Sequence, residues 1–236
     1  MPEKIALYFH ETEIKELEDL EKIILYFHER NYEFVTVNEL TQNLKSDLKY
    51  VALTFDDGFS SWVDTLDLFK THNVRATYFV NTIQFTDLDL DKFLSDIRCT
   101  DSKLLINKKE INEIISHGHE IGSHTHTHRT LSKLDLPQLI EEIDTNLEIL
   151  NKIGAEINNF AIPYGMRRLI KNEHIPYLQT KFNSIAFGEP GMLHHQEIDK
   201  LQRYPWKVLK SFEYNIKNMK TDTSFFNKIT KRSGLG

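Results

Sequence analysis

The sequence has only one cysteine, Cys99, among its 236 residues. A single thiol excludes an internal disulfide, and it is compatible with a reducing compartment without proving one. Nothing around Cys99 in the sequence indicates an activated nucleophile, so we expect a structural side chain there. Internal repeats and low-complexity segments are also absent, which argues against a repeat architecture.

The sequence also lacks a long apolar run and an excess of positive charge. Charged residues appear at once, at Glu3, Lys4 and Glu11, so the opening does not look like a basic and then apolar leader. We therefore expect no secretory signal, no transmembrane segment and a cytoplasmic location, with peripheral membrane association left open. The formal net charge of -6 argues against nucleic acid as the main partner.

What the chain does contain is typical of a soluble globular protein, with 40% hydrophobic and 27% charged residues. Its length fits one large α/β domain with an ample core. Strand and helix patterns alternate along the sequence. Strands are predicted over 5–9, 34–37, 51–55, 76–80, 120–122, 159–162 and 184–187, and helices over 14–30, 38–43, 62–72, 107–116 and 136–153.

One predicted strand ends on two adjacent carboxylates. The apolar run from Val51 to Phe55 is typical of a strand covered on both faces, and Asp56, Asp57 and Gly58 follow it. Because successive side chains of an extended chain point in different directions, one carboxylate can face a metal and the other a reacting water. Asp-Gly is also a common turn dipeptide, so a solvated turn is the alternative.

A histidine cluster further along offers nitrogen ligands. His124 and His128 are four residues apart, so one helical turn or a tight loop brings both imidazoles to one side, while His126 should point elsewhere. With Asp57 they make a three-ligand set that leaves positions open for water and substrate, as at a catalytic metal. Zinc suits these donors, and cobalt, nickel or iron fit them too. Surface or satisfied core histidines are the alternative.

Three stretches together carry a family resemblance. Thr54-Phe55-Asp56-Asp57-Gly58, then 124–128, then Phe160-Ala161-Ile162-Pro163-Tyr164-Gly165, resemble the first three motifs of the polysaccharide deacetylases, the NodB homology domain of carbohydrate esterase family 4. The resemblance covers about residues 4 to 206. It implies a single α/β domain, the distorted (β/α)7 barrel, whose site gathers at the C-terminal strand ends.

The resemblance also implies roles for these residues. Asp57, His124 and His128 would hold a divalent ion, and Asp56 would act as the general base. The backbone N–H of Tyr164 would help to stabilise the oxyanion. The implied function is metal-dependent removal of the N-acetyl group from an amino sugar in a polysaccharide or a glycan precursor.

The first predicted strand ends on His10. This opening is similar to that of circularly permuted exopolysaccharide deacetylases, including those acting on poly-N-acetylglucosamine, in which an N-terminal histidine replaces one near the C-terminus. The resemblance makes His10 the candidate general acid, which would protonate the departing amine. A histidine that closes a strand without a chemical task is the alternative.

One departure concerns the start of the third motif, where many family members have an arginine that contacts the base aspartate. This chain has Ala161 there. Arg203, Arg167 or Arg168 could supply the missing charge, and Arg203 is preferred because it lies in a stretch resembling a degenerate fourth motif. The usual acidic residue of that motif is not clearly placed, and Asp199 is a weak substitute.

Two further regions lie outside the motifs. Residues 82–106 resemble an insertion, either a lid over the substrate groove or a surface helix with an apolar inner face. Residues 207–236 form a predicted lysine-rich helix or tail after the domain of residues 1–206. A solvated face explains its lysines, and contact with an anionic substrate is the alternative. They are Lys207, Lys210, Lys217, Lys220, Lys228 and Lys231.

The motifs leave other functions open. A deacylase or deformylase of a nucleotide- or lipid-linked sugar would use the same residues. A glycan-binding module could keep the barrel without turnover, although intact ligands and an intact Asp56 argue against it. A hydrolase of another C–N bond is the third alternative. In each reading except the last, we expect a carbohydrate partner.

Overall fold

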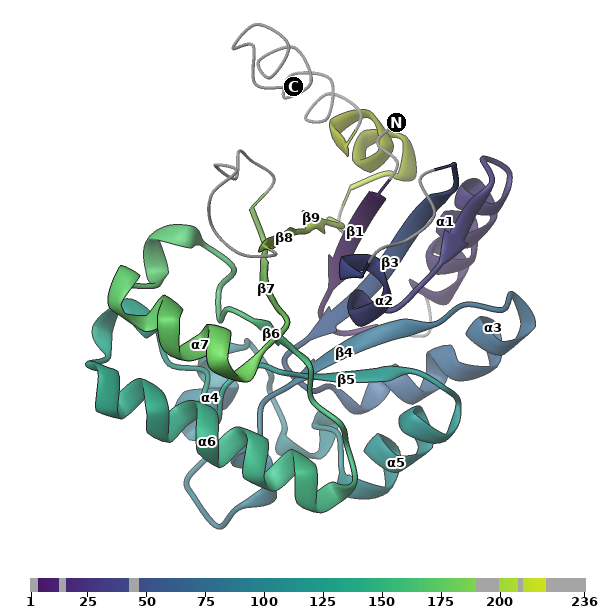
Figure 1. The fold of residues 1–236 in the computed structure, drawn as a ribbon. Coiled ribbons are helices and arrows are strands. Elements are labelled where there is room, and N and C mark those ends of the chain that lie inside the picture. Colours follow the sequence, from purple (N-terminus) through teal and green to yellow (C-terminus); the bar gives the residue numbers. More distant parts are fainter. Residues whose placement is uncertain (1–3, 13–15, 43–46, 190–199, 208–209, 220–236) are drawn as a thin grey trace, which may run out of the picture.

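A single parallel sheet curls into a barrel with helices on its outside (Figure 1). The computed structural model describes residues 4–12, 16–42, 47–189, 200–207 and 210–219. Neighbouring strands follow the order β8-β7-β6-β5-β4-β3-β1-β9, and β2 pairs with β3. The strands are β1 (Lys4–Phe9), β2 (Tyr32–Phe34), β3 (Lys49–Asp56), β4 (Ala76–Val80), β5 (Glu120–Ser123), β6 (Asn159–Ala161), β7 (Ser184–Phe187), β8 (Lys200–Gln202) and β9 (Tyr204–Pro205).

The two ends of this strand order are consecutive in the chain, because only Arg203 separates β8 from β9. The Arg203 N–H donates to the Phe187 carbonyl at 2.9 Å, and the Trp206 N–H donates to the Tyr8 carbonyl at 3.1 Å. The segment 200–205 therefore spans the seam between β7 and β1. Together with β1 and β3 to β7, this segment forms a nearly closed barrel of strands. The predicted NodB-type barrel is thus confirmed.

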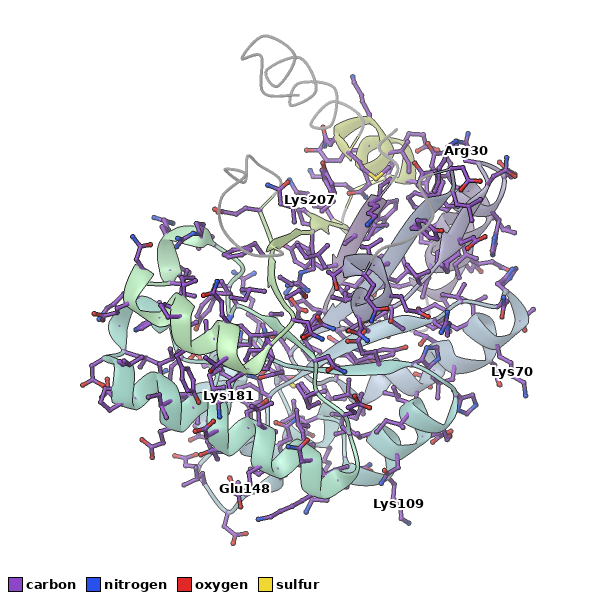
Figure 2. All side chains as sticks on the ribbon, in the orientation of Figure 1. Arg30, Lys70, Lys109, Glu148, Lys181 and Lys207 are labelled. Carbon is purple, nitrogen blue, oxygen red and sulfur yellow. The ribbon has the colours of Figure 1, made fainter. Side chains whose placement is uncertain are left out.

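The helices cover the barrel from outside. Leu139 and Ile143 of α6 pack with Leu178 of α7 against Phe160 of β6 in one apolar cluster. In Figure 2 the labelled Lys109 and Glu148 extend away from the barrel, as expected for the solvent faces of α5 and α6. The helices are α1 (Leu17–His28), α2 (Val37–Thr41), α3 (Leu66–Thr71), α4 (Asp91–Asp96), α5 (Lys108–Ser116), α6 (Leu136–Ile153) and α7 (Ile175–Lys181).

Strand β3 lies in the middle of the core. It pairs with β1 on one side and with β4 on the other, and all its residues after Lys49 are buried. Phe55 stacks between Phe9 and Tyr78, with ring centroids 5.2 and 5.0 Å away. Each such buried side chain stabilises the fold by about 1.5–3 kcal/mol. This packing holds the backbone that delivers Asp56 to the end of the barrel.

Several sequence expectations are confirmed. The strands predicted at 76–80 and 184–187 are β4 and β7, and the helix predicted over 136–153 is α6, all with the expected bounds. Pro137 lies in the first turn of α6, and Gly154 ends it with a φ of 102°. That left-handed conformation favours glycine because it has no Cβ.

Two helix starts were predicted wrongly. The helix predicted over 38–43 is α2, which begins at Val37 and is capped by Thr36: the Thr36 hydroxyl accepts from the Glu39 N–H, and the Glu39 carboxylate accepts from the Thr36 N–H. This reciprocal box satisfies two free donors and places the boundary earlier. The segment predicted as one helix over 62–72 is a 3₁₀ turn, Ser60–Thr65, followed by α3. Phe59 precedes that turn, and no serine side chain caps it.

The regions outside the motifs pack on the barrel. In the 82–106 segment, α4 turns Phe93 into the main core, where it is 2% exposed, and the chain after it lines the pocket described below. Residues 212–219 are helical, and Ile216 and Met219 also join the main core. Lys220, Lys228 and Lys231 lie outside the described residues, as does Asp199. Within the described part of the chain, no helix has the length and apolar character to cross a membrane.

His119, next to β5, gives the first testable prediction. It is 7% exposed, and its Nδ1 accepts the Ala76 N–H at 3.1 Å, so the ring is neutral. Burial lowers the pKa of His119 to about 4, with smaller contributions from His117 and Arg75. The unfolded chain has a histidine pKa of about 6.5, so between these values only the unfolded state binds the proton. Stability present above pH 6.5 is therefore lost as the pH falls towards 4.

For the metal-stripped protein, we expect the wild type to lose about 2 kcal/mol more unfolding free energy than His119→Gln between pH 7 and pH 5. Urea unfolding at the two pH values measures this difference. Equal losses in both proteins would show that His119 titrates normally in the folded state.

Candidate active site

The carboxyl ends of the strands surround a pocket of about 490 Å³. This is the end of the barrel where parallel strands place loop residues of different origin together. The pocket collects every residue that the sequence assigned to the site. Its lining consists of Tyr8, His10, Glu11, Asp56, Asp57, Phe59, Asp96, Ile97, Arg98, His124, His128, Tyr164, Gly165, Gly188 and Arg203.

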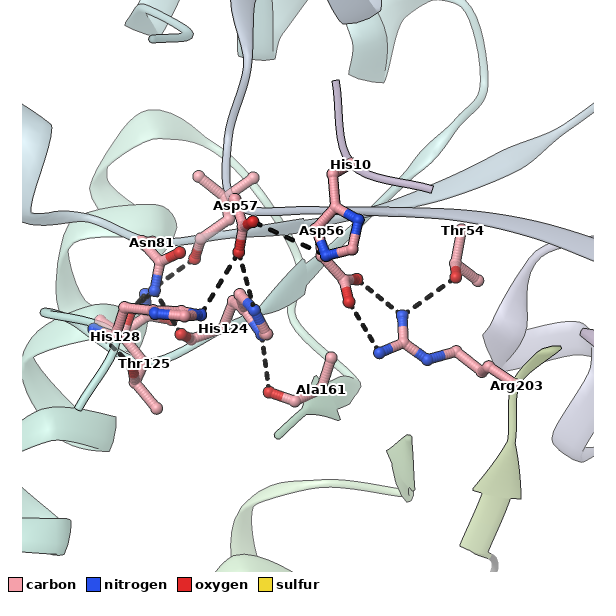
Figure 3. A network of polar contacts seen from close by, with 12 residues as sticks. His10, Thr54, Asp56, Asp57, Asn81, His124, Thr125, His128, Ala161 and Arg203 are labelled. Carbon is pink, nitrogen blue, oxygen red and sulfur yellow. Dashed lines mark hydrogen bonds and ion pairs between the residues drawn. The ribbon is translucent and has the colours of Figure 1, made fainter. Parts of the chain in front are cut away.

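Asp56 and Asp57 leave the end of β3 in different directions. Asp56 is the last residue of the strand, whereas Asp57 has a φ of 83° and Gly58 one of 86°. The left-handed turn sends the Asp57 carboxylate towards the histidines and leaves Asp56 facing Arg203 (Figure 3). Both aspartates are 4% exposed. The solvated-turn alternative is therefore wrong.

Both imidazoles of the histidine motif reach Asp57. The Nε2 atoms of His124 and His128 lie 3.2 and 3.4 Å from Asp57 Oδ1. The motif is a tight loop, with φ values of 69° at Thr125 and 58° at His128. His126 points elsewhere, as expected, and its Nδ1 lies 2.9 Å from the Thr82 hydroxyl.

The chemistry of these three donors fits a cation. One ligand atom from each of Asp57, His124 and His128 lies within 4.8 Å of the others. The Nδ1 of His124 is 2.8 Å from the Ala161 carbonyl, which can only accept, so Nδ1 carries the proton when the ring is neutral. Its Nε2 is then an acceptor that faces a carboxylate oxygen and a second imidazole. Three converging acceptors need a positive charge between them, and the Ala161 carbonyl orients the His124 ring as metal ligands require.

The protonation states of Asp57 and His128 agree with that reading, whereas His124 shares a proton with Asp57 as long as no cation lies between them. Burial raises the pKa of the Asp57 carboxyl, but contact with His124, His128 and His10 lowers it by more. The net result is a pKa of about 2. Burial also lowers the pKa of His128 to about 4. For His124, burial lowers the pKa and the hydrogen bond to Asp57 raises it, with a net increase. Near neutral pH, Asp57 is therefore ionised and His128 neutral, as ligands must be.

Arg203 reaches the other aspartate. Its Nη1 lies 2.6 Å from Asp56 Oδ1 and its Nη2 2.8 Å from Asp56 Oδ2, which makes a two-pronged pair. Nη1 also donates to the Thr54 hydroxyl at 3.0 Å. The side chain is fully buried, between the rings of Tyr8 and Phe79. The arginine missing at Ala161 is thus replaced in space by one from the barrel seam.

Of the other candidate arginines, neither is among the residues that line the pocket. Arg167 donates to Asn172 at 3.0 Å, and Arg168 contacts the sulfur of Met166 at 3.4 Å. Both follow the third motif in a 3₁₀ turn, Arg167–Leu169, that has no buried residue. The structure therefore favours Arg203 as the partner of Asp56.

His10 and Tyr164 both line the pocket that contains Asp57. The His10 Nε2 lies 3.9 Å from Asp57 Oδ2, and the His10 side chain is 54% exposed. The Tyr164 ring packs on the ring of His128, with centroids 4.6 Å apart. Tyr164 has a φ of 62°, and within the described residues its backbone N–H donates to no protein group. Tyr164 itself lines the pocket.

Sequence reasoning missed Tyr8 as a pocket residue. Tyr8 lies on β1, two positions before His10, which directly follows the strand, so both side chains point to one side and their rings are 5.6 Å apart. A Cβ on Gly188 would come within 3.2 Å of the Tyr8 hydroxyl, so the glycine leaves room for this ring. The two-residue period of the strand was the available signal.

Known proteins with similar sequences cover part of the chain. A family model described as polysaccharide deacetylase matches residues 43–178. The peptidoglycan-N-acetylglucosamine deacetylase PgdA of Listeria monocytogenes is 31% identical over 120 residues, which are 50% of this chain and 22% of PgdA. A chitin deacetylase of Colletotrichum lindemuthianum is 32% identical over 115 residues, 48% of this chain and 39% of that protein. The matched part thus spans well under half of these curated relatives.

Solved structures resemble almost the whole chain. The deacetylase PplD of Streptococcus pyogenes, in complex with acetate, has a TM-score of 0.72 and 17% identity, over 90% of this chain and 96% of that chain. A de-N-acetylase from Aggregatibacter actinomycetemcomitans has a TM-score of 0.69 and 14% identity, over 91% of this chain and 98% of that chain. At these identities, the likeness establishes the shared barrel fold.

Proposed function

This chain belongs to the polysaccharide deacetylase family, and on that premise we propose that it is a metal-dependent hydrolase that removes the N-acetyl group of an amino sugar in a polysaccharide or a glycan precursor. One observation carries the proposal. In one pocket, the Asp56 carboxylate is hydrogen-bonded by a buried arginine. Beside it lie a separate carboxylate and two imidazoles that suit a cation.

Asp57, His124 and His128 would hold the divalent ion. Zinc suits this donor set, and cobalt, nickel or iron accept the same donors. When bound, such an ion supplies Lewis-acid chemistry, which acidifies water and polarises an amide carbonyl. His10 and Asp56 are not part of the converging group of donors, so they stay available for proton transfer.

Asp56 is placed to accept the proton of the attacking water. Arg203 binds both carboxylate oxygens, and each oxygen keeps a second lone pair for this proton. The fork fixes the carboxylate plane, so the base need not reorient during the reaction. Because Arg203 is fully buried, its guanidinium stays beside Asp56 when substrate excludes water.

Tyr164 and His10 would act on the other side of the amide. The Tyr164 N–H would donate to the oxygen that becomes negative when water adds to the carbonyl. His10, exposed to the pocket and in reach of Asp57, would protonate the departing amine, which is a poor leaving group without a proton. The nitrogen–carbon bond then breaks, and acetate and a free amine leave.

The first test is metal content. We expect about one equivalent of metal in the wild type and its loss in Asp57→Ala and His128→Ala, because each variant removes one of three buried donors. Elemental analysis of the three proteins measures this, and His126→Ala is the matched control from the same loop. A wild type without site-dependent metal, even after zinc is added back, would contradict the proposal.

The second test is the product. Free acetate, formate and ammonia should be assayed from N-acetylated and N-formylated sugars, free and as oligomers, since the polymer and its precursors expose the same group. Acetate release from N-acetylated sugars supports the proposal. Formate or ammonia alone would point to a deformylase or to another C–N hydrolase, and no product at saturating metal would point to a glycan-binding module.

A leaving-group comparison tests His10. His10→Gln should lower the turnover of an N-acetyl sugar by about 10²–10⁴-fold, because the amine then leaves without a proton donor. An activated aryl acetate, whose leaving group needs no proton, should be far less affected, and metal content should not change. An equal loss with both substrates would assign His10 a structural or ligand-related role.

A further inference from the structure

The histidine loop at residues 124–128 is held by side chains from outside every recognised motif. We propose that Asn81, Glu142 and Asn146 are positioning residues that fix this loop so that both imidazoles face Asp57. The inference rests on the proposed function only in that the loop holds a metal. It concerns metal binding and needs no deacetylase activity.

The backbone conformation of the loop is not stabilised by contacts within the loop alone. Thr125 and His128 have φ values of 69° and 58°, and such left-handed conformations cost free energy for residues with a Cβ, most of all for β-branched threonine. The loop has one hydrogen bond of its own, from the His128 N–H to the Thr125 hydroxyl at 3.0 Å. Conformations of this kind persist when surrounding groups determine them.

Two buried amides bind the first half of the loop. Asn81, directly after β4, donates from Nδ2 to the carbonyls of His124 and Thr125. Asn146, on α6, donates from Nδ2 to the Thr125 carbonyl at 2.7 Å and to the Val80 carbonyl at 3.0 Å. Both side chains are fully buried. Since carbonyl oxygens only accept, these sites require a donor, which aspartate or leucine cannot supply.

A buried carboxylate binds the second half. Glu142 of α6 is 6% exposed, and its Oε2 accepts the Thr127 N–H at 2.8 Å while its Oε1 accepts the Thr127 hydroxyl. The Glu142 backbone carbonyl also accepts the His126 N–H at 3.1 Å. One helical turn of α6, from Glu142 to Asn146, therefore forms hydrogen bonds with both halves of the loop.

The remaining loop contacts come from the barrel. The His124 N–H donates to the Val80 carbonyl at 3.2 Å, and the His126 carbonyl accepts from Thr82 and Ile83 at 3.3 and 3.0 Å. The peptide groups between the two ligands are thus bound to β4, to Thr82 and Ile83 after it, and to α6. Loss of one tie should let an imidazole turn away from Asp57, which weakens metal binding before it unfolds the barrel.

The experiment measures zinc affinity of metal-stripped protein by competition with a chromophoric chelator. We expect Asn146→Asp and Glu142→Leu to bind zinc about 10–100-fold more weakly than the wild type. Glu142→Gln should recover most of the affinity, because its amide oxygen still accepts the Thr127 N–H. The matched control is Asn215→Asp, since the Asn215 amide also donates to backbone carbonyls, at Lys207 and Ser211, away from the loop.

A second readout separates positioning from general stability. Cobalt(II) bound to the variants should show an altered visible spectrum, because the ligand geometry changes, while circular dichroism shows a folded barrel. If Asn146→Asp does not fold, Asn81→Leu and the two Glu142 variants decide the matter. Affinities within twofold of the wild type and unchanged cobalt spectra would overturn the inference.

The outcomes also distinguish this inference from the proposed function. Weakened zinc binding in the variants, with no acetate released by the wild type, supports the inference and rejects the deacetylase. Acetate release by the wild type with unchanged zinc affinity in the variants rejects the inference alone. A wild type that binds no zinc at Asp57 overturns both.

Discussion

Replacing Asp56 with asparagine should lower the rate of amide hydrolysis by about 10²–10⁴-fold, the usual contribution of a positioned general base. The amide of asparagine has nearly the same shape but cannot take the proton of the attacking water. Asp56 lies outside the group of donors that converge on Asp57, so metal content should stay at the wild-type level. Steady-state acetate release, with metal analysis of the same samples, measures both.

The contrast with Asp57→Asn makes this prediction specific. Asp57→Asn should lose metal and activity together, whereas Asp56→Asn should lose activity alone, although the two residues are neighbours in the sequence and equally buried. A loss of metal in both variants would mean that Asp56 is also a ligand. A rate within tenfold of the wild type for Asp56→Asn would remove it as the base.

Much of the barrel could be predicted from the sequence because local signals agreed with one another. Helix α6 has an acidic cap, a proline in its first turn, a regular apolar face and a glycine at its end. Strand β3 is an apolar run that ends on carboxylates. Such signals depend only on residues that are neighbours in the sequence, so a single sequence is enough to detect them.

The site could be predicted in part for a different reason. Asp57, His124 and His128 were assigned from residue types, spacing and family resemblance, and the structure brings all three together. The partner of Asp56 stayed open among three arginines, because 147 positions separate the two residues and no local pattern reports their contact. Only the closing of the barrel, with β8 and β9 on either side of Arg203, brings them together.

The residues that support the histidine loop could not be predicted from the sequence, and the physical reason is the same. Asn81 follows a strand and Asn146 lies inside a helix, and both read locally as ordinary polar residues. Their signal was burial, which a sequence shows weakly: Asn146 occupies the inner face of α6, where Leu139, Ile143 and Leu150 predict apolar neighbours. A polar residue on an apolar helical face needs a partner when buried, and here that partner is loop backbone.

Replacing Arg203 with alanine should have the second large effect. The change leaves the Asp56 carboxylate buried without its partner, and breaking such a pair typically costs about 3–5 kcal/mol of unfolding free energy. It also removes the side chain that fills the barrel seam between Tyr8 and Phe79. Urea unfolding should show this loss, and acetate release should fall because the base is no longer held in one plane.

Arg203→Lys separates charge from geometry. Lysine keeps the positive charge but cannot bind both carboxylate oxygens as a planar fork, so we expect metal content to persist while turnover falls. Unchanged turnover in Arg203→Lys would mean that charge alone supports Asp56, and unchanged turnover in Arg203→Ala would remove Arg203 from the site.

A double-mutant cycle tests the coupling of the pair directly. Asp56→Asn and Arg203→Ala each leave a buried group with a poor partner, whereas the double variant leaves neither charge behind. Its loss of unfolding free energy should therefore be smaller than the sum of the two single losses by about 0.5–3 kcal/mol. Additive losses would mean that the bidentate contact at 2.6 and 2.8 Å contributes nothing specific to the fold. Arg203 would then fill space at the barrel seam, and the tuning of the base would have to come from elsewhere.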